Sequence, residues 1–398
     1  MFLEILLAIS IGILAGVFTG LLPGIHTNLV SVFLVSFSPL LLGYFTPISL
    51  AILIVAMTIA NNYIDFIPAI YLGAPDEDTA LSAQPGHSML LKGQGHKAVL
   101  LSLLGSTLAL PLVLIFTPIL IFTLPKIYPF AERMMAWILI WICILLIAKE
   151  KFRTQALIIF ILSGFLGIAS LNSNISQPLL PLLTGLFGAS ALIQSISQKV
   201  QIPQQEISKL EIKKSELIKP SISAVLIAPF CSFLPGMGSS QAAIIGSSIF
   251  REISREQFLI LVGSVNTIIN SLAFVVLYTI GKSRTGSAVA VQNILQLSVE
   301  NLVYITAIIM ITAIISIFLA MVISKIFAKN IDKINYSKIS IAILIFLTVV
   351  IFYFTGPIGF LIFAVSTILG ITCSLLEVRK GFLMGSLLIP TILFYAPI

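Results

Sequence analysis

Charged side chains are scarce in this sequence. Only 9% of its 398 residues are Asp, Glu, Lys or Arg, and 58% are hydrophobic, whereas about a quarter of a soluble domain is charged. This excludes an ordinary soluble globule, because the chain could not cover a surface that faces water. Apolar runs of about 18–25 residues, each long enough to cross a bilayer, recur along the chain. The strict alternation of a membrane β-barrel is missing, so we expect an all-α, polytopic membrane protein.

Signatures of several enzyme classes are also missing. The sequence has no H-E-x-x-H and no G-x-S-x-G motif. Gly281-Lys282-Ser283 is similar to the end of a P-loop, but Val276 stands where the upstream glycine is required, so ATP drive is not expected. The three cysteines lie far apart in apolar stretches and are expected to be packing residues. We expect no enzyme and no cofactor or metal, apart from a coupling ion, Na⁺ or H⁺.

The basic residues indicate how the chain is oriented. Segment 221–250 is interpreted as a hairpin that turns at Leu234-Pro235-Gly236 and returns to the side from which it entered. Four of the 22 Lys and Arg residues then lie on one side and the other 18 on the opposite side, whereas a single crossing would give a nearly even split. The positive-inside rule favours the hairpin and places the larger set in the cytoplasm. The net charge of +7 therefore indicates orientation in the cytoplasmic membrane, and not nucleic-acid binding. The first apolar run lacks a basic n-region, so no cleavable signal peptide is expected.

The two halves of the chain resemble each other. "LLPGIHTN" (Leu21–Asn28) aligns with "FLPGMGSS" (Phe233–Ser240), Gly73–Gln84 aligns with Gly281–Gln292, and Asn62 meets Asn270. With the orientation above, the order of segments predicts two inverted-topology repeats, an organisation typical of secondary transporters. The expected parts are a first repeat, 1–198, with a hairpin at 3–44 and helices to 197; a cytoplasmic linker, 199–220; and a second repeat, 221–398, with a hairpin at 221–250 and helices to 397. Whether 3–44 is a re-entrant hairpin or two full crossings stays open.

Each Pro-Gly break interrupts a helix inside an apolar run. Proline removes a backbone donor and glycine permits unusual dihedral angles. Thr27 or Asn28 and Ser239 or Ser240 suit the N-cap of the following helix, and exposed helix N-termini suit a carboxylate. A purely structural kink is the alternative. The expected substrate-binding residues are Pro23, Gly24, His26, Thr27, Asn28, Pro235, Gly236, Gly238, Ser239, Ser240 and Gln241.

Polar residues inside two other apolar runs are candidates for cation coupling. Asp65 is the only acid well inside such a run, and an intramembrane carboxylate is functional by default. Asn61 and Asn62 lie one turn away, and Asn266 and Asn270 share a helix face in the second half. The alternative for Asp65 is a structural, hydrogen-bonded acid near the membrane interface.

Two loops and one histidine leave alternatives open. Asp76 and Asp78 could form gating contacts with Arg284, or could simply complement a helix dipole as solvated loop charges. His26 could carry a coupling proton or bind a carboxylate, or could be a neutral structural residue. His26 and Asp65 also leave one alternative function, an intramembrane enzyme or lipid-processing protein.

Longer stretches resemble a known family. "GLLPGIHTN", "FLPGMGSS" and above all "GAPDEDTALSAQPGHSMLLKGQGHKAVLLSLLGS" look like the large permease subunit of the tripartite tricarboxylate transporters, the TctA family, in its shorter archaeal-type branch. Its pattern has an LPG-type break early in each half, and an "IPG…ATALDGYPLARKG" stretch that matches Ala74–Gly93. The resemblance spans nearly the whole chain. It implies a secondary carrier of small carboxylates, driven by a cation gradient, that works in bacteria with a small membrane subunit and a periplasmic binding protein.

Overall fold

A computed structural model of the protein describes residues 2–22, 27–73, 79–148, 150–175, 177–197, 202–207, 210–234, 237–250, 252–282, 285–331 and 336–396. All regular elements in these ranges are helices, so the prediction of an all-α protein is confirmed. The first half contains α1 (Phe2–Leu21), α2 (Thr27–Ser36), α3 (Ser38–Leu41), α4 (Pro47–Ile64), α5 (Phe66–Tyr71), α6 (Ala80–Leu90), α7 (Gly95–Arg133), α8 (Met135–Ala148), α9 (Arg153–Leu171), α10 (Leu179–Leu183), the π-helix η1 (Thr184–Ala189) and α11 (Ser190–Ser197). The second half contains α12 (Lys214–Cys231), α13 (Ser239–Ile249), α14 (Arg255–Ile280), α15 (Gly286–Ile294), α16 (Val299–Asn330), α17 (Tyr336–Leu375), the 3₁₀-helix η3 (Lys380–Met384) and α18 (Gly385–Tyr395).

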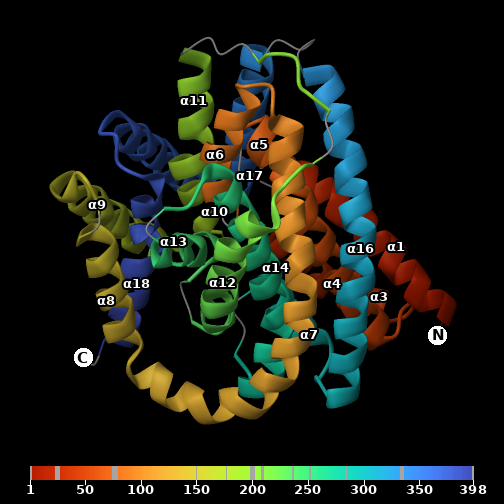
Figure 1. The fold of residues 1–398 in the computed structure, drawn as a ribbon. Coiled ribbons are helices and arrows are strands. Elements are labelled where there is room, and N and C mark those ends of the chain that lie inside the picture. Colours follow the sequence, from red (N-terminus) through yellow and green to blue (C-terminus); the bar gives the residue numbers. More distant parts are fainter. Residues whose placement is uncertain are drawn as a thin grey trace.

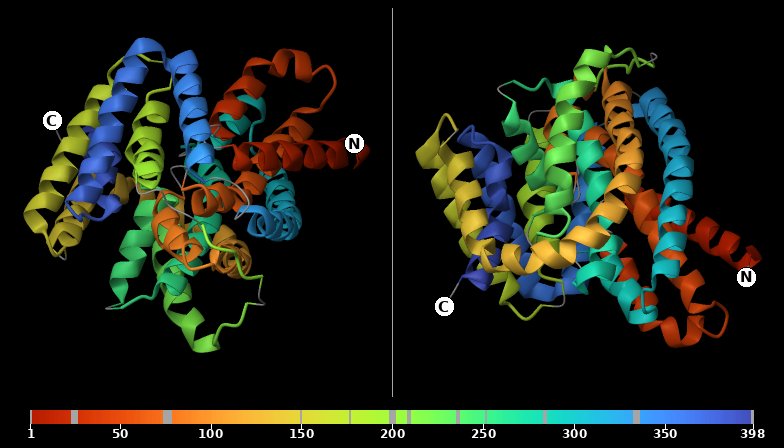
Figure 2. Two further views of the ribbon diagram at one scale, coloured as in Figure 1. Left: turned by 90° about the horizontal axis from the view of Figure 1, so that it is seen from above. Right: turned by 60° about the horizontal axis from the view of Figure 1, so that its bottom comes forward.

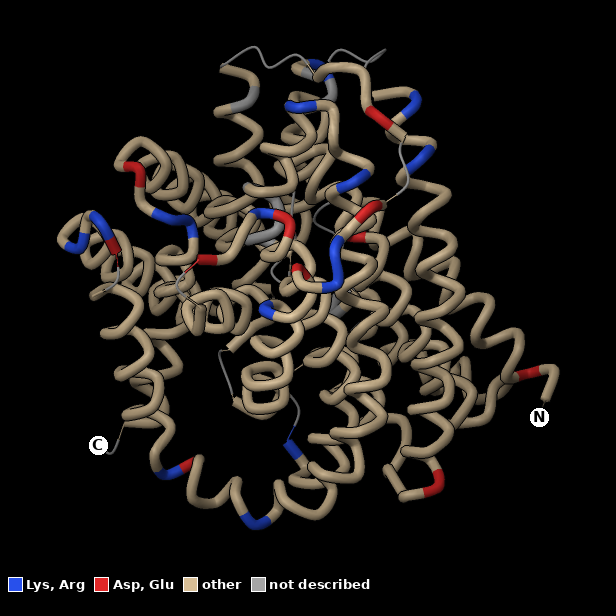
Figure 3. The backbone as a smooth tube through the Cα atoms, in the orientation of Figure 1, with Lys and Arg blue, Asp and Glu red and all other residues tan. Residues whose placement is uncertain are grey.

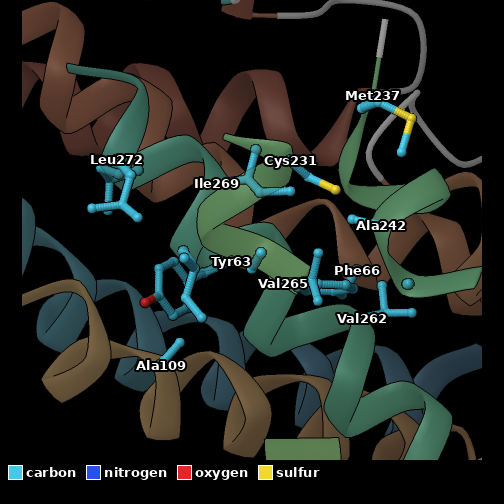
Figure 4. Packing of buried hydrophobic residues seen from close by; sticks show 14 of the residues in the cluster. Tyr63, Phe66, Ala109, Cys231, Met237, Ala242, Val262, Val265, Ile269 and Leu272 are labelled. Carbon is cyan, nitrogen blue, oxygen red and sulfur yellow. The ribbon is translucent and has the colours of Figure 1, made fainter. Parts of the chain in front are cut away.

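Seven helical segments of the described chain are long and apolar enough to cross a membrane. Two of them, α4–α5 and α14, are completely surrounded by protein, whereas only 22% to 44% of each of the other five is buried. α4–α5 and α14 pack against each other through Tyr63 and Phe66 on one side and Val265 and Ile269 on the other (Figure 4). Helices α1, α7, α12, α13, α15 and α16 pack around this pair (Figure 1).

Helix α1 runs parallel to α4. Near the start of α1, the Glu4 carboxylate accepts hydrogen bonds from the backbone N–H of Thr46, at 2.5 Å, and from its hydroxyl, at 2.9 Å. Further along, Gly12 lies so close to the carbonyl of Leu53 that an added Cβ would be 2.5 Å from its oxygen. Small residues allow this approach, as in other membrane helix pairs. Helices α1 and α4 therefore begin at the same end of this helix pair.

Helix α12 ends, and α13 begins, beside the middle of α14. Helix α12 starts next to the start of α14, where the Gln257 side chain donates to the carbonyl of Glu216 at 3.2 Å. At the other end of α12, Cys231 lies near Ile269 (Figure 4). Helix α13 then starts beside Asn266, to which Ser239 donates a hydrogen bond, and runs back. Since α14 continues to Ile280, the chain reverses well before α14 ends.

Helices α7 and α14 cross in very close contact. Gly105 lies against the carbonyl of Ile260, and Gly263 against that of Ser102. The hydroxyl of Ser264 donates to the carbonyl of Gly105 at 2.9 Å, and that of Ser106 donates to Gly263 at 3.1 Å. This reciprocal pair of hydrogen bonds fixes the position of α7 along the axis of α14.

Some boundaries differ from the sequence-based prediction. Helix α7 extends to Arg133 and curves beneath the molecule to α8 (Figure 1). Four prolines inside it, among them Pro118 and Pro125, remove helical hydrogen bonds and permit this bend. Helix α12 starts at Lys214 and so includes the end of the predicted linker 199–220. Helix α17 is interrupted at Gly356, which has a φ of 64°.

The helices fall into two groups. The central group consists of α1–α7 and α12–α16, and the flanking group consists of α8–α11, α17, η3 and α18; the extensive packing contacts lie within each group. The flanking group forms one side of the molecule in both views of Figure 2. Helix α13 packs on η3, and the junction of α7 with α8 links the groups.

Lys and Arg gather at one end of the described structure (Figure 3). Contacts between distant segments join residues at this end, including an ion pair between Lys97 and Glu256 at 2.6 Å. At the opposite end, Lys282 pairs with Glu132, and its ammonium lies 5.1 Å from the centre of the Tyr128 ring. This distribution agrees with the charge asymmetry predicted from the sequence.

Candidate functional site

Part of the predicted site lies outside the described residues. These residues are Pro23, Gly24, His26, Asp76, Asp78, Pro235, Gly236 and Arg284. Asn28 belongs to α2, and nothing is described of its side chain. Thr27 is the first residue of α2 and is buried. The remaining predicted residues are all described, and they fall into two polar clusters.

The first cluster joins the start of α13 to the middle of α14. Ser239 donates to the side-chain oxygen of Asn266 at 3.0 Å, and the amide of Asn270 donates to the same oxygen at 2.7 Å. The i, i+4 spacing predicted that Asn266 and Asn270 would share a helix face, and this is confirmed. The prediction that Ser239 or Ser240 caps α13 is wrong, because Gly238 occupies the N-cap without a side-chain hydrogen bond. The Ser239 hydroxyl therefore bonds across to α14.

This cluster contains polar atoms without a hydrogen-bond partner among the described residues. They are the side-chain nitrogen and oxygen of Gln241 and the side-chain nitrogen of Asn266; on the same helix α14, the hydroxyl of Ser271 also has no partner in the described chain. Gln241 is 2% exposed and Asn266 is fully buried. Buried polar groups are nearly always satisfied in native proteins, so each exception requires an explanation such as a bound water or ligand. The free amide N–H groups lie beside the positive end of the α13 dipole, where an anion is favoured.

The second cluster lies where α1 ends beside α4. The amide of Asn61 donates to the hydroxyl of Thr19 at 3.1 Å. The neighbouring Asn62 is 6% exposed, and its side-chain nitrogen has no partner in the described chain. Asp65, at 4% exposure, is the residue between α4 and α5. The helix is interrupted there because Pro68 cannot donate to the carbonyl of Ile64.

The five residues predicted to couple a cation therefore all lie on the two wholly buried helices. Their side chains offer amide and carboxylate oxygens, which hard cations prefer. The described residues contain no group of three or more His, Cys, Asp or Glu side chains that could hold a metal ion. Sequence reasoning missed Thr19 and Ser271, because a hydroxyl in an apolar helix gives no signal until its neighbour is known.

A smaller contact joins the two halves next to these clusters. Ser31 of α2 donates to Ser287 of α15 at 3.4 Å, and both are fully buried. The segment after the first break thus meets the short helix of the opposite half. Conversely, α6 of the first half contacts α13 of the second half.

Comparison with known proteins identifies the family. The model of the "Tripartite tricarboxylate transporter TctA family" matches residues 6–385 of this chain. The chain belongs to the TctA family. An uncharacterized protein of Methanocaldococcus jannaschii is 30% identical over 378 residues, which cover 91% of this chain and 92% of that protein. No solved structure matches the chain.

Membership of the TctA family, together with the seven apolar helical segments, makes this a multi-pass membrane protein and a component of a transporter. The predicted resemblance to the family is therefore confirmed. Tripartite transporters also include a binding protein and a small membrane subunit. The alternative of an intramembrane enzyme or lipid-processing protein is not favoured, because the family is one of transporters. Of its two supporting residues, His26 lies outside the described chain and Asp65 belongs to the second cluster.

Proposed function

We propose that this TctA-family protein is a secondary active transporter of small carboxylates in the cytoplasmic membrane, driven by a Na⁺ or H⁺ gradient. The substrate binds between the two Pro-Gly breaks near the bilayer midplane. The observation that carries this proposal is the buried side-chain amide of Gln241 and the buried side-chain nitrogen of Asn266 beside the start of α13, which have no hydrogen-bond partner among the described residues.

The packing pattern supports an inverted repeat. The long helix α7 of the first half packs on α14 of the second half, and the long helix α16 of the second half packs on α4 of the first half. Likewise α15 contacts α2, while α6 contacts α13. Exchanging the halves maps each contact onto its counterpart, as expected for two repeats related by a pseudo-twofold axis.

The depth of the second break supports a re-entrant hairpin. Helix α14 has 26 residues, about 39 Å at 1.5 Å per residue. Ser239 meets it at Asn266, 11 residues after its start, or about 16 Å into the membrane. A chain that reverses there does not cross. The parallel arrangement of α1 and α4 fits the same geometry in the first half.

The chemistry of the clusters supports a carboxylate and a cation together. Amide N–H groups and a helix N-terminus stabilise a carboxylate without the permanent charge of a lysine, and a cation that binds together with the substrate offsets the negative charge of the carboxylate. Asp65 and the amide oxygens of Asn61, Asn62 and Asn270 supply the coupling site. The gating contacts of Asp76 and Asp78 with Arg284, and a role for His26, remain part of the proposal.

Alternating access requires one part of the protein to move against another. We propose that the central group, which contains both breaks, moves relative to the flanking group. The partition of packing contacts supports such a division, because few elements bridge the groups. A small membrane subunit and an extracytoplasmic binding protein are the proposed partners.

Uptake of labelled citrate and succinate into proteoliposomes, with imposed Na⁺ or H⁺ gradients, tests the function. Wild-type protein is expected to accumulate at least one carboxylate in response to one gradient. Ser239→Ala, Asn266→Ala and Gly24→Leu are expected to reduce the rate at least tenfold. Ser10→Ala is the matched control, because Ser10 is exposed and bonds only to Leu6 of its own helix. Gradient-independent behaviour, or equal uptake in all variants, would refute the proposal.

The hairpin has its own test. Tags placed at Lys214 and Arg251 are expected to report the same side of the membrane. Tags on opposite sides would show that 221–250 crosses.

A further inference from the structure

A cavity of about 1060 Å³ lies between the central and flanking groups. Its walls come from α8, α9, η3 and α18 of the flanking group and from α6, α13 and the start of α14 in the central group. It lies at the end of the molecule where Lys and Arg gather, since Arg255, Arg379 and Lys380 line it. It is separate from the two polar clusters, none of whose residues line it.

The wall of the cavity is amphipathic. Leu146, Phe160 and Leu388 contribute an apolar surface from three helices. Hydroxyl groups of Ser247 and Ser248 lie on the α13 side. A small hydrophilic anion would leave most of this apolar surface without a contact. The volume of the cavity is similar to that of the largest pockets that hold drug-sized ligands.

Two of the three cations at the cavity already have partners. Arg379 forms an ion pair with Glu150 at 3.2 Å, and Arg255 donates to the hydroxyl of Ser88 at 2.8 Å. Both side chains are exposed. The third cation, Lys380, is different: it is half-buried and forms no ion pair within the described part of the chain. Glu252 also lines the cavity, but the described contacts do not join it to Lys380.

A half-buried ammonium without a counter-ion is unfavourable. Burial lowers the pKa of Lys380, and the nearby Cys373 only partly opposes this effect. The free energy of desolvation is recovered when an anion pairs with the ammonium. Basic pockets between membrane helices on the cytoplasmic side are suited to acidic lipid head groups.

We propose that this cavity binds an anionic membrane lipid, whose acidic head group pairs with Lys380 while a hydrocarbon chain lies along Leu146, Phe160 and Leu388. The exposed Arg255 and Arg379 lie at the rim and attract the head group. The lipid fills the space between the two groups of helices and contacts both of them. The proposal does not depend on which solute the protein transports.

Native mass spectrometry of the full-length protein tests the site. The protein is placed in phosphatidylcholine nanodiscs with increasing phosphatidylglycerol, and retained phosphatidylglycerol is counted after release. We expect Lys380→Gln to weaken retention about fivefold, which corresponds to about 1 kcal/mol per basic residue. Lys151→Gln is the matched control, because Lys151 is an exposed cation at the same end that does not line the cavity. Lys380→Arg keeps the charge and is expected to retain the lipid.

A second variant distinguishes binding of the lipid's hydrocarbon chain from binding of its head group. Leu388→Trp fills part of the apolar wall and is expected to weaken retention while every cation stays in place. Inorganic phosphate and glycerol phosphate at millimolar concentration are expected not to compete, because they lack a hydrocarbon chain. Competition by these anions or by succinate would overturn the proposal in favour of a site for free anions. Equal retention by wild type, Lys380→Gln and Leu388→Trp would also overturn it.

Discussion

Replacing Gly105 by alanine tests the packing of α7 on α14. The new Cβ would overlap the carbonyl oxygen of Ile260, well inside the 3.0 Å that real Cβ contacts respect. A backbone carbonyl cannot rotate away, so the two helices have to separate. Separation also lengthens the hydrogen bonds of Ser106 and Ser264.

The expected cost follows from these two effects. Overpacking a well-packed contact costs about 1–3 kcal/mol, and each interhelical hydrogen bond in a membrane protein contributes about 0.6 kcal/mol. The free energy of unfolding is therefore expected to fall by about 2–4 kcal/mol, which lowers the Tm of a chain of this length by about 2–5 °C.

The chain supplies its own reporter for the measurement. Cys143, Cys231 and Cys373 are free and buried, so a thiol-reactive fluorophore reports thermal unfolding of the detergent-solubilised protein. Gly188→Ala is the matched control, because the nearest atom to its added Cβ would be 3.9 Å away. It is expected to leave Tm unchanged or to raise it, since alanine favours a helix over glycine. If Gly105→Ala melts within about 1 °C of wild type while the control behaves as expected, the packing argument is wrong.

Three further predictions concern individual polar residues. Asp65→Asn is expected to abolish the response of carboxylate uptake to the cation gradient while exchange without a gradient continues; an unchanged gradient response would exclude Asp65 from coupling. Burial lowers the pKa of His87, so the unfolded chain takes up this proton near pH 6.5 before the folded protein does, and Tm is expected to fall below that pH. His87→Gln should remove part of this acid sensitivity, and parallel Tm curves for the two proteins would contradict the assignment. Lys282→Ala breaks an exposed ion pair with Glu132 and should cost at most about 1 kcal/mol, so a fall in Tm as large as that of Gly105→Ala would be inconsistent with this reasoning.

The sequence predicted the presence of the helices more reliably than the contacts that each helix makes. Composition alone indicated helices. The length and bend of α7 could not be predicted from the local sequence, because four prolines lie inside this helix and each of them removes a helical hydrogen bond. Neighbouring helices satisfy the groups that proline frees, and this compensation is not visible in the local sequence.

Within the site, the residue types were predictable and their partners were not. Asn266 and Asn270 share a face because of their spacing, so their contact followed from the sequence. The bond from Ser239 to Asn266 depends on how α13 folds back, and local propensity suggested a cap instead. The complete burial of α4 and α14 was also hidden, since an apolar helix that faces lipid and one that faces protein have similar compositions.

Because the apolar windows of α4–α5 and α14 are buried in protein, the thickness of the bilayer acts on the polar clusters mainly through the helices outside them. Those helices differ widely in length: α9 has 19 residues and α16 has 32, or about 28 Å and 48 Å. In a hydrocarbon layer of about 30 Å, α9 fits nearly upright, whereas α16 has to tilt or project into the head groups. A thinner or thicker membrane therefore changes the tilt of these outer helices first, while the buried pair and the side chains it carries keep their arrangement.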